Sequence, residues 1–131
     1  MIKQHVKVLV VEDQELWCHQ FFGEVLEDLG YVVFPAPTKE KAIELLDQYR
    51  FDLAIIDINL TAITGNTDGL LVVDYLRSKD TDLPIIVVSG TDGDFRSLRE
   101  QGYIIFAEIS KELFDLEQFM AQVQKAVNRE D

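Results

Sequence analysis

The sequence predicts a doubly wound α/β fold, a (βα)5 open sheet of five parallel strands with helices on both faces. Short runs rich in valine and isoleucine alternate with longer amphipathic segments along the chain, as expected of strand–helix repeats. Most of these runs are apolar at every position, which is typical of parallel strands covered on both faces. The chain has 131 residues, which is enough for one domain with a hydrophobic core.

Five segments are predicted to be strands, and four of them are apolar throughout. In chain order they are Val6–Val11, Tyr31–Phe34, Leu53–Asp57, Ile85–Ser89 and Ile104–Ile109. Connections between parallel strands are right-handed and carry a helix, so a helix is expected after each strand.

The segments that follow the strands have the periodicity of amphipathic helices. The predicted helices cover Phe22–Leu29, Ala42–Tyr49, Leu70–Arg77, Phe95–Gln101 and Leu116–Val127. Asp115 is the expected N-cap of the last helix. Residues Ile58–Gly69 form one long loop, and loops of this length are often functional.

The composition excludes several classes of protein. The formal net charge of −12, from 12 basic and 24 acidic side chains, argues against direct binding of nucleic acid. A single cysteine, Cys18, excludes an internal disulfide framework and a multi-cysteine metal site. The first residues resemble no signal peptide, and no apolar run is long enough to span a membrane. We therefore expect a cytoplasmic protein that forms one domain over residues 1–131, with no output domain.

Polar side chains follow four of the predicted strands. In an open parallel sheet, ligands bind beyond the carboxyl ends of the strands, where the strand order reverses. An order of 2-1-3-4-5 places the first strand beside the third. The residues at these ends are Glu12, Asp13, Asp57 and Ser89, with Lys111 just past the fifth strand. Three carboxylates, a hydroxyl and an amine are therefore expected to converge.

This combination of groups suits phosphoryl transfer. Two carboxylates about 4 Å apart repel by on the order of 4 kcal/mol at an effective dielectric constant near 20, so a bound cation is expected, and oxygen ligands suit Mg²⁺. The cation and Lys111 would neutralise charge on the transferring oxygens, and Ser89 would donate a hydrogen bond to one of them. Asp57 would be the nucleophile and would form an acyl phosphate. Gly90 leaves room for the phosphoryl group.

With these residues in this order, the sequence resembles the receiver domain of response regulators from two-component signalling, as in chemotaxis regulators. The likeness extends from Val6 to about Val127. It is carried by Glu12–Asp13, Asp57, the segment Leu83–Gly90 and Lys111, each after the matching strand. The resemblance implies a flavodoxin-like sheet of order 2-1-3-4-5 and no conventional enzyme activity beyond self-phosphorylation and autodephosphorylation.

The resemblance also implies a role for each site residue. Asp57 matches the phosphoacceptor, which receives its phosphoryl group from a sensor histidine kinase or a phosphotransfer protein. Asp13, Asp57 and the backbone carbonyl of Asn59 would bind Mg²⁺ directly, and Glu12 would bind it through water. Lys111 would contact the phosphoryl group.

Other positions match residues that transmit phosphorylation to the surface of such domains. Ser89 would shift towards the phosphoryl group and move the loop at Gly90 and Thr91, while Asn59 and Thr91 tune the rate of dephosphorylation. The surface formed by the fourth helix, the fifth strand and the fifth helix would then act on an unknown downstream effector. Such a protein is expected to be a monomer or a weak homodimer.

Three positions depart from the family pattern. Thr61 and Glu112 stand where family members usually have proline, and the second of those prolines usually follows a cis bond. A cis bond before a residue other than proline costs about 2.5–4 kcal/mol, so Lys111 is expected to be held differently. The switch aromatic is replaced by Glu108. Phe106, two residues earlier and on the same face of the strand, could substitute for it.

Two other functions remain open. The departures at Thr61, Glu108 and Glu112 are also compatible with a receiver-like interaction module that is not regulated by phosphorylation. A phosphatase of the haloacid-dehalogenase type also uses an aspartyl nucleophile, but that residue usually ends the first strand and is followed two positions later by aspartate. Trp17 is expected to be a packing residue close enough to report metal binding by fluorescence.

Overall fold

The computed structural model describes residues 5–58, 68–90 and 98–128. Five parallel strands form one sheet in the order β2-β1-β3-β4-β5, which confirms the predicted doubly wound fold. The strands are β1 (Lys7–Val11), β2 (Val32–Ala36), β3 (Leu53–Asp57), β4 (Ile85–Ser89) and β5 (Ala107–Ser110). β1, β3 and β4 match their predicted bounds to within one residue.

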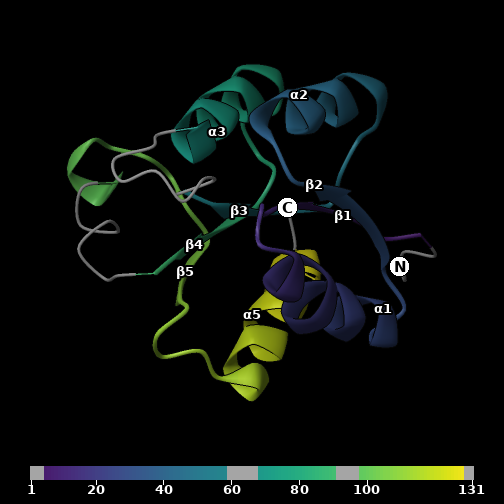
Figure 1. The fold of residues 1–131 in the computed structure, drawn as a ribbon. Coiled ribbons are helices and arrows are strands. Elements are labelled where there is room, and N and C mark those ends of the chain that lie inside the picture. The colour runs from purple at the N-terminus through teal and green to yellow at the C-terminus, as the bar shows by residue number, and fades with distance from the viewer. Residues whose placement is uncertain (1–4, 59–67, 91–97, 129–131) are drawn as a thin grey trace.

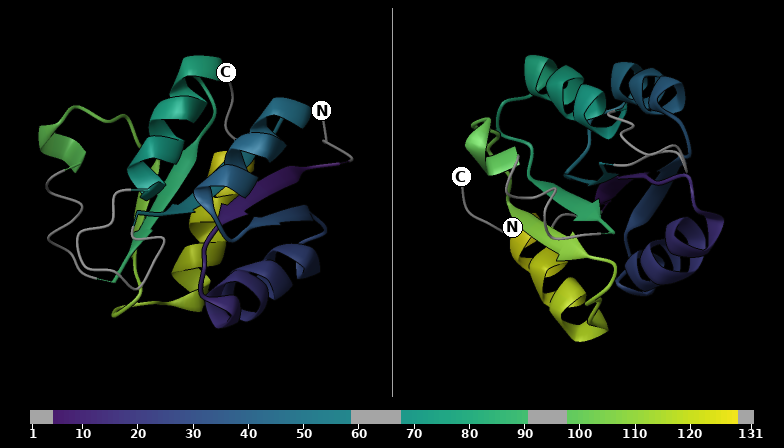
Figure 2. Two further views of the ribbon diagram at one scale, coloured as in Figure 1. Left: turned by 45° about the horizontal axis from the view of Figure 1, so that its top comes forward. Right: turned by 60° about the vertical axis from the view of Figure 1, so that its left-hand side comes forward.

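Helices cover both faces of this sheet (Figures 1 and 2). α2 (Lys39–Gln48) and α3 (Asp68–Lys79) lie on one face. On the other face lie α5 (Leu116–Asn128) and the first helix, which consists of η1 (Leu16–Glu24) and α1 (Val25–Asp28). Residues 98–100 are also helical; the preceding part of the predicted fourth helix lies outside the described residues.

The alternation of side chains along the strands produces two hydrophobic cores. In β1, Leu9 and Val11 belong to the core under α2 and α3, while Val8 and Val10 belong to the core under α1 and α5. β3 and β4 are buried at every position. Burial on both faces explains why these strands are apolar throughout, and why a charged side chain can only stand at their ends.

The predicted bounds of two strands are wrong. β2 begins one residue late and extends through Pro35 to Ala36, because an edge strand tolerates a residue without an N–H group. β5 begins three residues later than predicted, because β4 starts only at Ile85. The carbonyl of Ile85 accepts the N–H of Phe106 at 2.8 Å and Ile86 pairs with Ala107, so two apolar residues of the predicted strand, Ile104 and Ile105, precede the pairing. One of them, Ile104, is 78% exposed.

The first helix begins six residues before its predicted start, and its first nine residues, η1, are π-helical. A π-helix has more residues per turn than an α-helix, so the apolar positions of this segment do not follow the α-helical period. The helix buries Phe22, Leu26 and Cys18.

The predicted N-cap of the last helix is confirmed, whereas α2 and α3 begin three and two residues before their predicted starts. Asp115 caps α5, because its Oδ1 accepts hydrogen bonds from the backbone N–H groups of Glu117 and Gln118 at 3.0 and 3.3 Å. Thr38 caps α2 in the same way and accepts from Lys41 N at 3.1 Å. Within the described ranges, the helices are all too short or too polar to cross a membrane.

Candidate functional site

The register of the sheet brings the polar strand ends together. Val11 of β1 lies beside Ile56 of β3, so the next residues along the two parallel strands, Glu12 and Asp57, are neighbours. On the other side, β3 pairs with β4, which ends at Ser89. Lys111 is fixed next to that end, since its N–H donates to the carbonyl of Ser89 at 2.8 Å.

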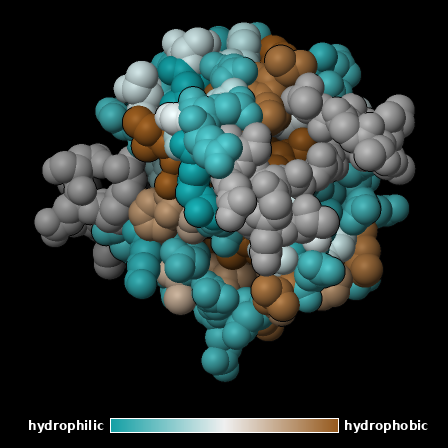
Figure 3. Space-filling model, turned by 90° about the vertical axis from the view of Figure 1, so that its left-hand side faces the viewer, coloured by the Kyte–Doolittle hydropathy of each residue, from teal (hydrophilic) through white to brown (hydrophobic). Residues whose placement is uncertain are grey.

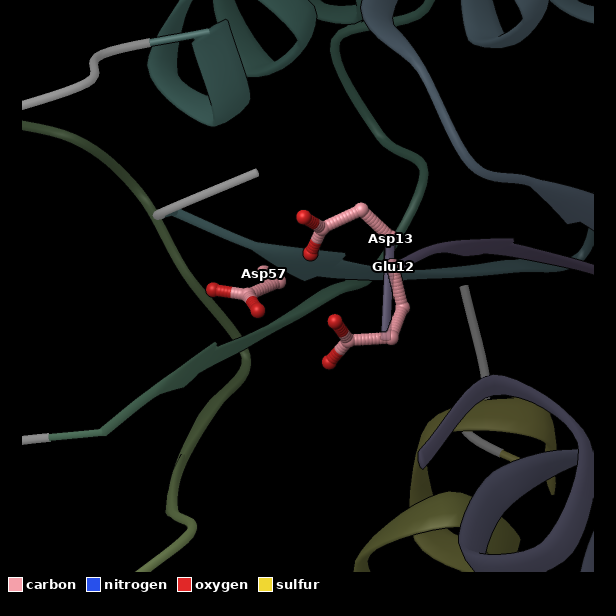
Figure 4. Close-up of side chains that lie close together, drawn as sticks. All are labelled: Glu12, Asp13 and Asp57. Carbon is pink, nitrogen blue, oxygen red and sulfur yellow. The ribbon is translucent and has the colours of Figure 1, made fainter. Parts of the chain in front are cut away.

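Three carboxylates face one space beyond the ends of β1 and β3 (Figure 4). Glu12, Asp13 and Asp57 each offer an oxygen atom, and these atoms all lie within 4.8 Å of one another. Glu12 and Asp57 are buried, with 1% and 3% of their surface exposed, while Asp13 is exposed. The structure therefore brings together the three acidic residues that the sequence singled out.

Lys111 lies between the two buried carboxylates. Its Nζ atom is 2.9 Å from Asp57 Oδ2 and 2.7 Å from Glu12 Oε1, and its side chain is 12% exposed. The amide oxygen of Gln14 also accepts a hydrogen bond from Nζ at 3.1 Å. Three carboxylates and one ammonium group leave the cluster with an excess of two negative charges when all are ionised.

Burial and charge repulsion raise the pKa of Glu12. Burial has the largest effect and Asp57 adds to it, while Lys111 and the N–H of Gln14 act in the opposite direction; the pKa is raised to about 8. Burial, together with the charge of Glu12, also raises the pKa of the Cys18 thiol to about 11. Cys18 therefore stays protonated at neutral pH.

The raised pKa of Glu12 predicts that the metal-free protein loses stability as the pH rises. The folded state binds a proton up to about pH 8, whereas the unfolded state releases it near pH 4.5. Between these values the folded state holds more protons, so the free energy of unfolding falls with rising pH, by at most about 1.4 kcal/mol for each pH unit. Denaturant unfolding at pH 5, 6, 7 and 8 in the presence of a chelator measures this slope.

Glu12→Gln removes the titrating group and should flatten the pH dependence of stability over this window. Glu44→Gln is the matched control, because Glu44 is exposed on α2 and its carboxylate forms a surface ion pair with Lys41. Equal slopes in the wild type and in Glu12→Gln would contradict the assignment. The raised pKa values of Lys111 and Cys18 place their titrations above this window.

The donor set fits a hard divalent cation. Its ligand atoms are carboxylate oxygens, which Mg²⁺ and Ca²⁺ prefer. Oε1 of Glu12 is buried and, apart from its ionic contact with Lys111, has no hydrogen-bond partner in the described parts of the chain. A cation would offset the excess negative charge that raises the pKa of Glu12. The predicted fourth oxygen, the carbonyl of Asn59, lies outside the described residues.

The remaining predicted site residues lie at the edge of this cluster or outside the described ranges. Ser89 is fully buried at the end of β4. Among the described residues, none comes within 4 Å of a Cβ atom placed at the exposed Gly90. Thr91 and Thr61 are not among the described residues.

The position of the expected switch aromatic carries an ion pair. Glu108 of β5 accepts two hydrogen bonds from Arg99, from Nε at 2.8 Å and from Nη2 at 3.1 Å. Phe106 precedes β5 instead of lying within it and is 38% exposed. On the face shown in Figure 3, hydrophobic residues form several separate groups between hydrophilic ones.

Two partners of Lys111 were not predicted from the sequence. Gln14 reaches it across 97 positions of the chain, and the ring of Trp17 lies with its centroid 5.3 Å from Nζ. The sequence signal that could have indicated them is that Gln14 and Trp17 follow the acidic pair Glu12–Asp13 closely, near the start of the first helix. Trp17 is thus both a packing residue, as expected, and a neighbour of the site.

Comparison with known proteins agrees with this geometry. A model of the response regulator receiver domain family matches residues 8–124. The virulence transcriptional regulatory protein PhoP of Salmonella typhimurium is 30% identical over 129 residues, which cover 95% of this chain and 53% of that protein. The chain thus spans about half the length of the curated relatives it matches.

Solved structures of response regulators are also similar. The non-phosphorylated HemR receiver domain from Leptospira biflexa superimposes with a TM-score of 0.77 at 27% identity, over 96% of this chain and 97% of that one. A response regulator from Burkholderia pseudomallei, whose structure contains a phosphorylated aspartic acid, a calcium ion and citrate, gives a TM-score of 0.74 at 25% identity, over 92% and 68% of the two chains.

Proposed function

The chain belongs to the response regulator receiver domain family, and we propose that it is switched by transfer of a phosphoryl group to Asp57. The observation that supports this most strongly is the placement of Lys111 Nζ between Asp57 and Glu12, at 2.9 and 2.7 Å. A buried carboxylate beside an ammonium group has both the nucleophile and the positive charge that phosphoryl transfer requires.

In the proposed reaction an oxygen of Asp57 attacks the phosphorus of a phosphohistidine. A P–O bond forms, the P–N bond breaks, and the imidazole nitrogen keeps the electron pair and takes a proton from solvent. The product is an acyl phosphate on Asp57. Lys111 stabilises the negative charge on the phosphoryl oxygens, and Ser89 donates a hydrogen bond to one of them.

Mg²⁺ would be held by Asp13 and Asp57, with Glu12 acting through water. When bound, it would neutralise charge on the phosphoryl oxygens. The close oxygen atoms of the three carboxylates and the buried Oε1 of Glu12 support this assignment.

The phosphodonor would be a sensor histidine kinase or a phosphotransfer protein. Phosphorylation would act on the surface formed by the fourth helix, β5 and α5. PhoP of Salmonella typhimurium is described as a transcriptional regulatory protein, so control of transcription is the output we propose for a protein that carries this domain.

One observation favours a second function, a receiver-like interaction module that phosphorylation does not control. The ion pair of Glu108 with Arg99 occupies the position where the family pattern has an aromatic switch residue. In that case Mg²⁺ and a phosphate mimic would bind without changing the surface around β5.

The proposed function is tested with a small acyl phosphate, such as acetyl phosphate, as donor. We expect the wild-type protein to take up one phosphoryl group per chain with Mg²⁺ present. Chelation of the metal should slow the uptake by about 10²-fold or more, because several kcal/mol of charge stabilisation are lost. Intact-protein mass spectrometry over time measures the rate.

Asp13→Asn should reproduce the effect of chelation, since it removes a metal ligand and leaves Asp57 in place. Asp28→Asn is the control, because Asp28 is an exposed residue at the end of α1, away from the strand ends. Rapid uptake without Mg²⁺, or a normal rate in Asp13→Asn, would overturn the metal assignment. No uptake under any condition would favour the interaction module.

A further inference from the structure

The ammonium group of Lys111 is held on one side by carboxylates and on another by an aromatic ring. Its Nζ atom contacts Asp57 and Glu12, and the centroid of the Trp17 ring is 5.3 Å away. This distance lies within the range of a cation–π interaction, in which the negative face of the ring attracts a cation. The interaction is stronger where water is excluded, and the Lys111 side chain is only 12% exposed.

The Trp17 ring is itself fixed by other aromatic residues. Its centroid lies 4.5 Å from that of Phe21, 5.6 Å from that of Phe22 and 5.2 Å, edge to face, from that of Phe114. Phe114 follows Lys111 by three residues and packs against Phe22 and Phe119 as well. Trp17 therefore joins η1 to the segment that carries Lys111 and contacts the lysine head group directly.

The ammonium group of a lysine stays in one position only if neighbouring groups hold it there. Its side chain is a flexible four-carbon stem, and a displacement of about 1 Å from the reacting group can cost about 10²-fold in rate. Lys111 is followed by Glu112, so the segment after it lacks the restraint of a proline ring at that position. Among the described residues outside the carboxylate cluster, Gln14 and Trp17 contact Nζ.

We propose that Trp17 is a positioning residue for Lys111, and that its ring holds the ammonium group over Asp57 for phosphoryl transfer. The effect on rate rests on the proposed function. The contact between Trp17 and Lys111 can be tested without it.

The first test compares two substitutions of Trp17 in the assay with acetyl phosphate and Mg²⁺. Trp17→Leu keeps an apolar side chain but loses the ring, and should slow phosphorylation on the order of 5- to 30-fold. Trp17→Phe keeps an aromatic face and should restore most of the rate. Phe51→Leu is the matched control: it removes a buried aromatic residue that packs against Phe34 in the core under α2 and α3, and should reduce the Tm but leave the rate unchanged.

A double-mutant cycle separates positioning from general loss of structure. In a Lys111→Met background the ring has no ammonium group to hold, so Trp17→Leu should cause no further fall in rate. The proposal is overturned if Phe51→Leu slows the reaction as much as Trp17→Leu does. It is also overturned if Trp17→Phe fails to restore the rate, or if the effects of Trp17→Leu and Lys111→Met multiply.

The second test uses fluorescence of the unphosphorylated protein. Trp17 is the single tryptophan of the chain, so its emission reports its surroundings alone. Lys111→Met should shift the emission, whereas Lys125→Met, at an exposed position of α5, should not. If the wild type takes up no phosphoryl group, the proposed function fails, and the emission still decides whether Trp17 contacts Lys111. Identical emission in the wild type and Lys111→Met would contradict that contact.

Discussion

Asp57→Asn is expected to abolish phosphorylation by both acetyl phosphate and a histidine kinase, with a fall in rate of at least about 10³-fold. An amide has no anionic oxygen that can attack phosphorus, so the nucleophile itself is lost. The substitution keeps the size of the side chain and removes one of the charges that crowd the strand ends. We therefore expect Asp57→Asn to fold, and its stability without metal to equal or exceed that of the wild type.

Asp68→Ala is the control for this prediction. Asp68 is also acidic and lies in the segment that follows β3, but it starts α3 and is not one of the three clustered carboxylates. Its removal should leave phosphorylation intact. Labelling of Asp57→Asn at the wild-type rate, with loss of labelling in Asp68→Ala, would reverse the assignment of the phosphoacceptor.

Gly69→Ala is expected to destabilise the fold by about 1–3 kcal/mol or more, because the added methyl group would collide with the backbone at the end of β3. A Cβ atom at this position would overlap the carbonyl oxygen of Asp57 and lie 2.5 Å from the Cα atom of Ile58. These are backbone atoms in a buried strand, so they cannot turn aside as a side chain would. The first turn of α3 and the end of β3 must then separate.

Thermal unfolding measures this loss, and a Tm lower by roughly 4–12 °C is expected for a domain of this size. Because the collision involves the backbone of Asp57, the rate of phosphorylation should fall as well. Gly90→Ala is the control, since a Cβ atom there has no neighbour within 4 Å in the part of the chain that the structure describes. Gly69→Ala with a Tm equal to that of Gly90→Ala would contradict the close approach of α3 to β3.

The fold and most of the site could be predicted from the sequence because the central strands are buried on both faces. Such strands tolerate polar side chains only at their ends, which marks where β1, β3 and β4 stop. Once the strand order is 2-1-3-4-5, the parallel register alone brings Glu12 beside Asp57. The N-cap Asp115 was equally predictable, since its role depends only on its neighbours in the chain.

What could not be predicted depends on contacts between distant segments. The aromatic residues of η1 pack against Phe114, and no local period of the sequence encodes this contact. The first residues of the predicted fifth strand are apolar and therefore fitted the pattern of a buried strand. Where β5 begins is instead decided by the position at which β4 begins, because the two strands pair from Ile86 and Ala107 onwards. The ion pair of Glu108 with Arg99 likewise requires β5 and residues 98–100 to lie side by side.

We propose that Asp57, in this cluster of carboxylates, is the residue that carries the phosphoryl group. The most direct measurement is to phosphorylate the wild-type protein with Mg²⁺, reduce it with borohydride, and identify the modified peptide by mass spectrometry. Borohydride converts an aspartyl phosphate to homoserine. Homoserine at position 57, formed only when Mg²⁺ and donor are both present, is the predicted result. Homoserine at another aspartate, or an unmodified Asp57 in fully phosphorylated protein, would contradict it.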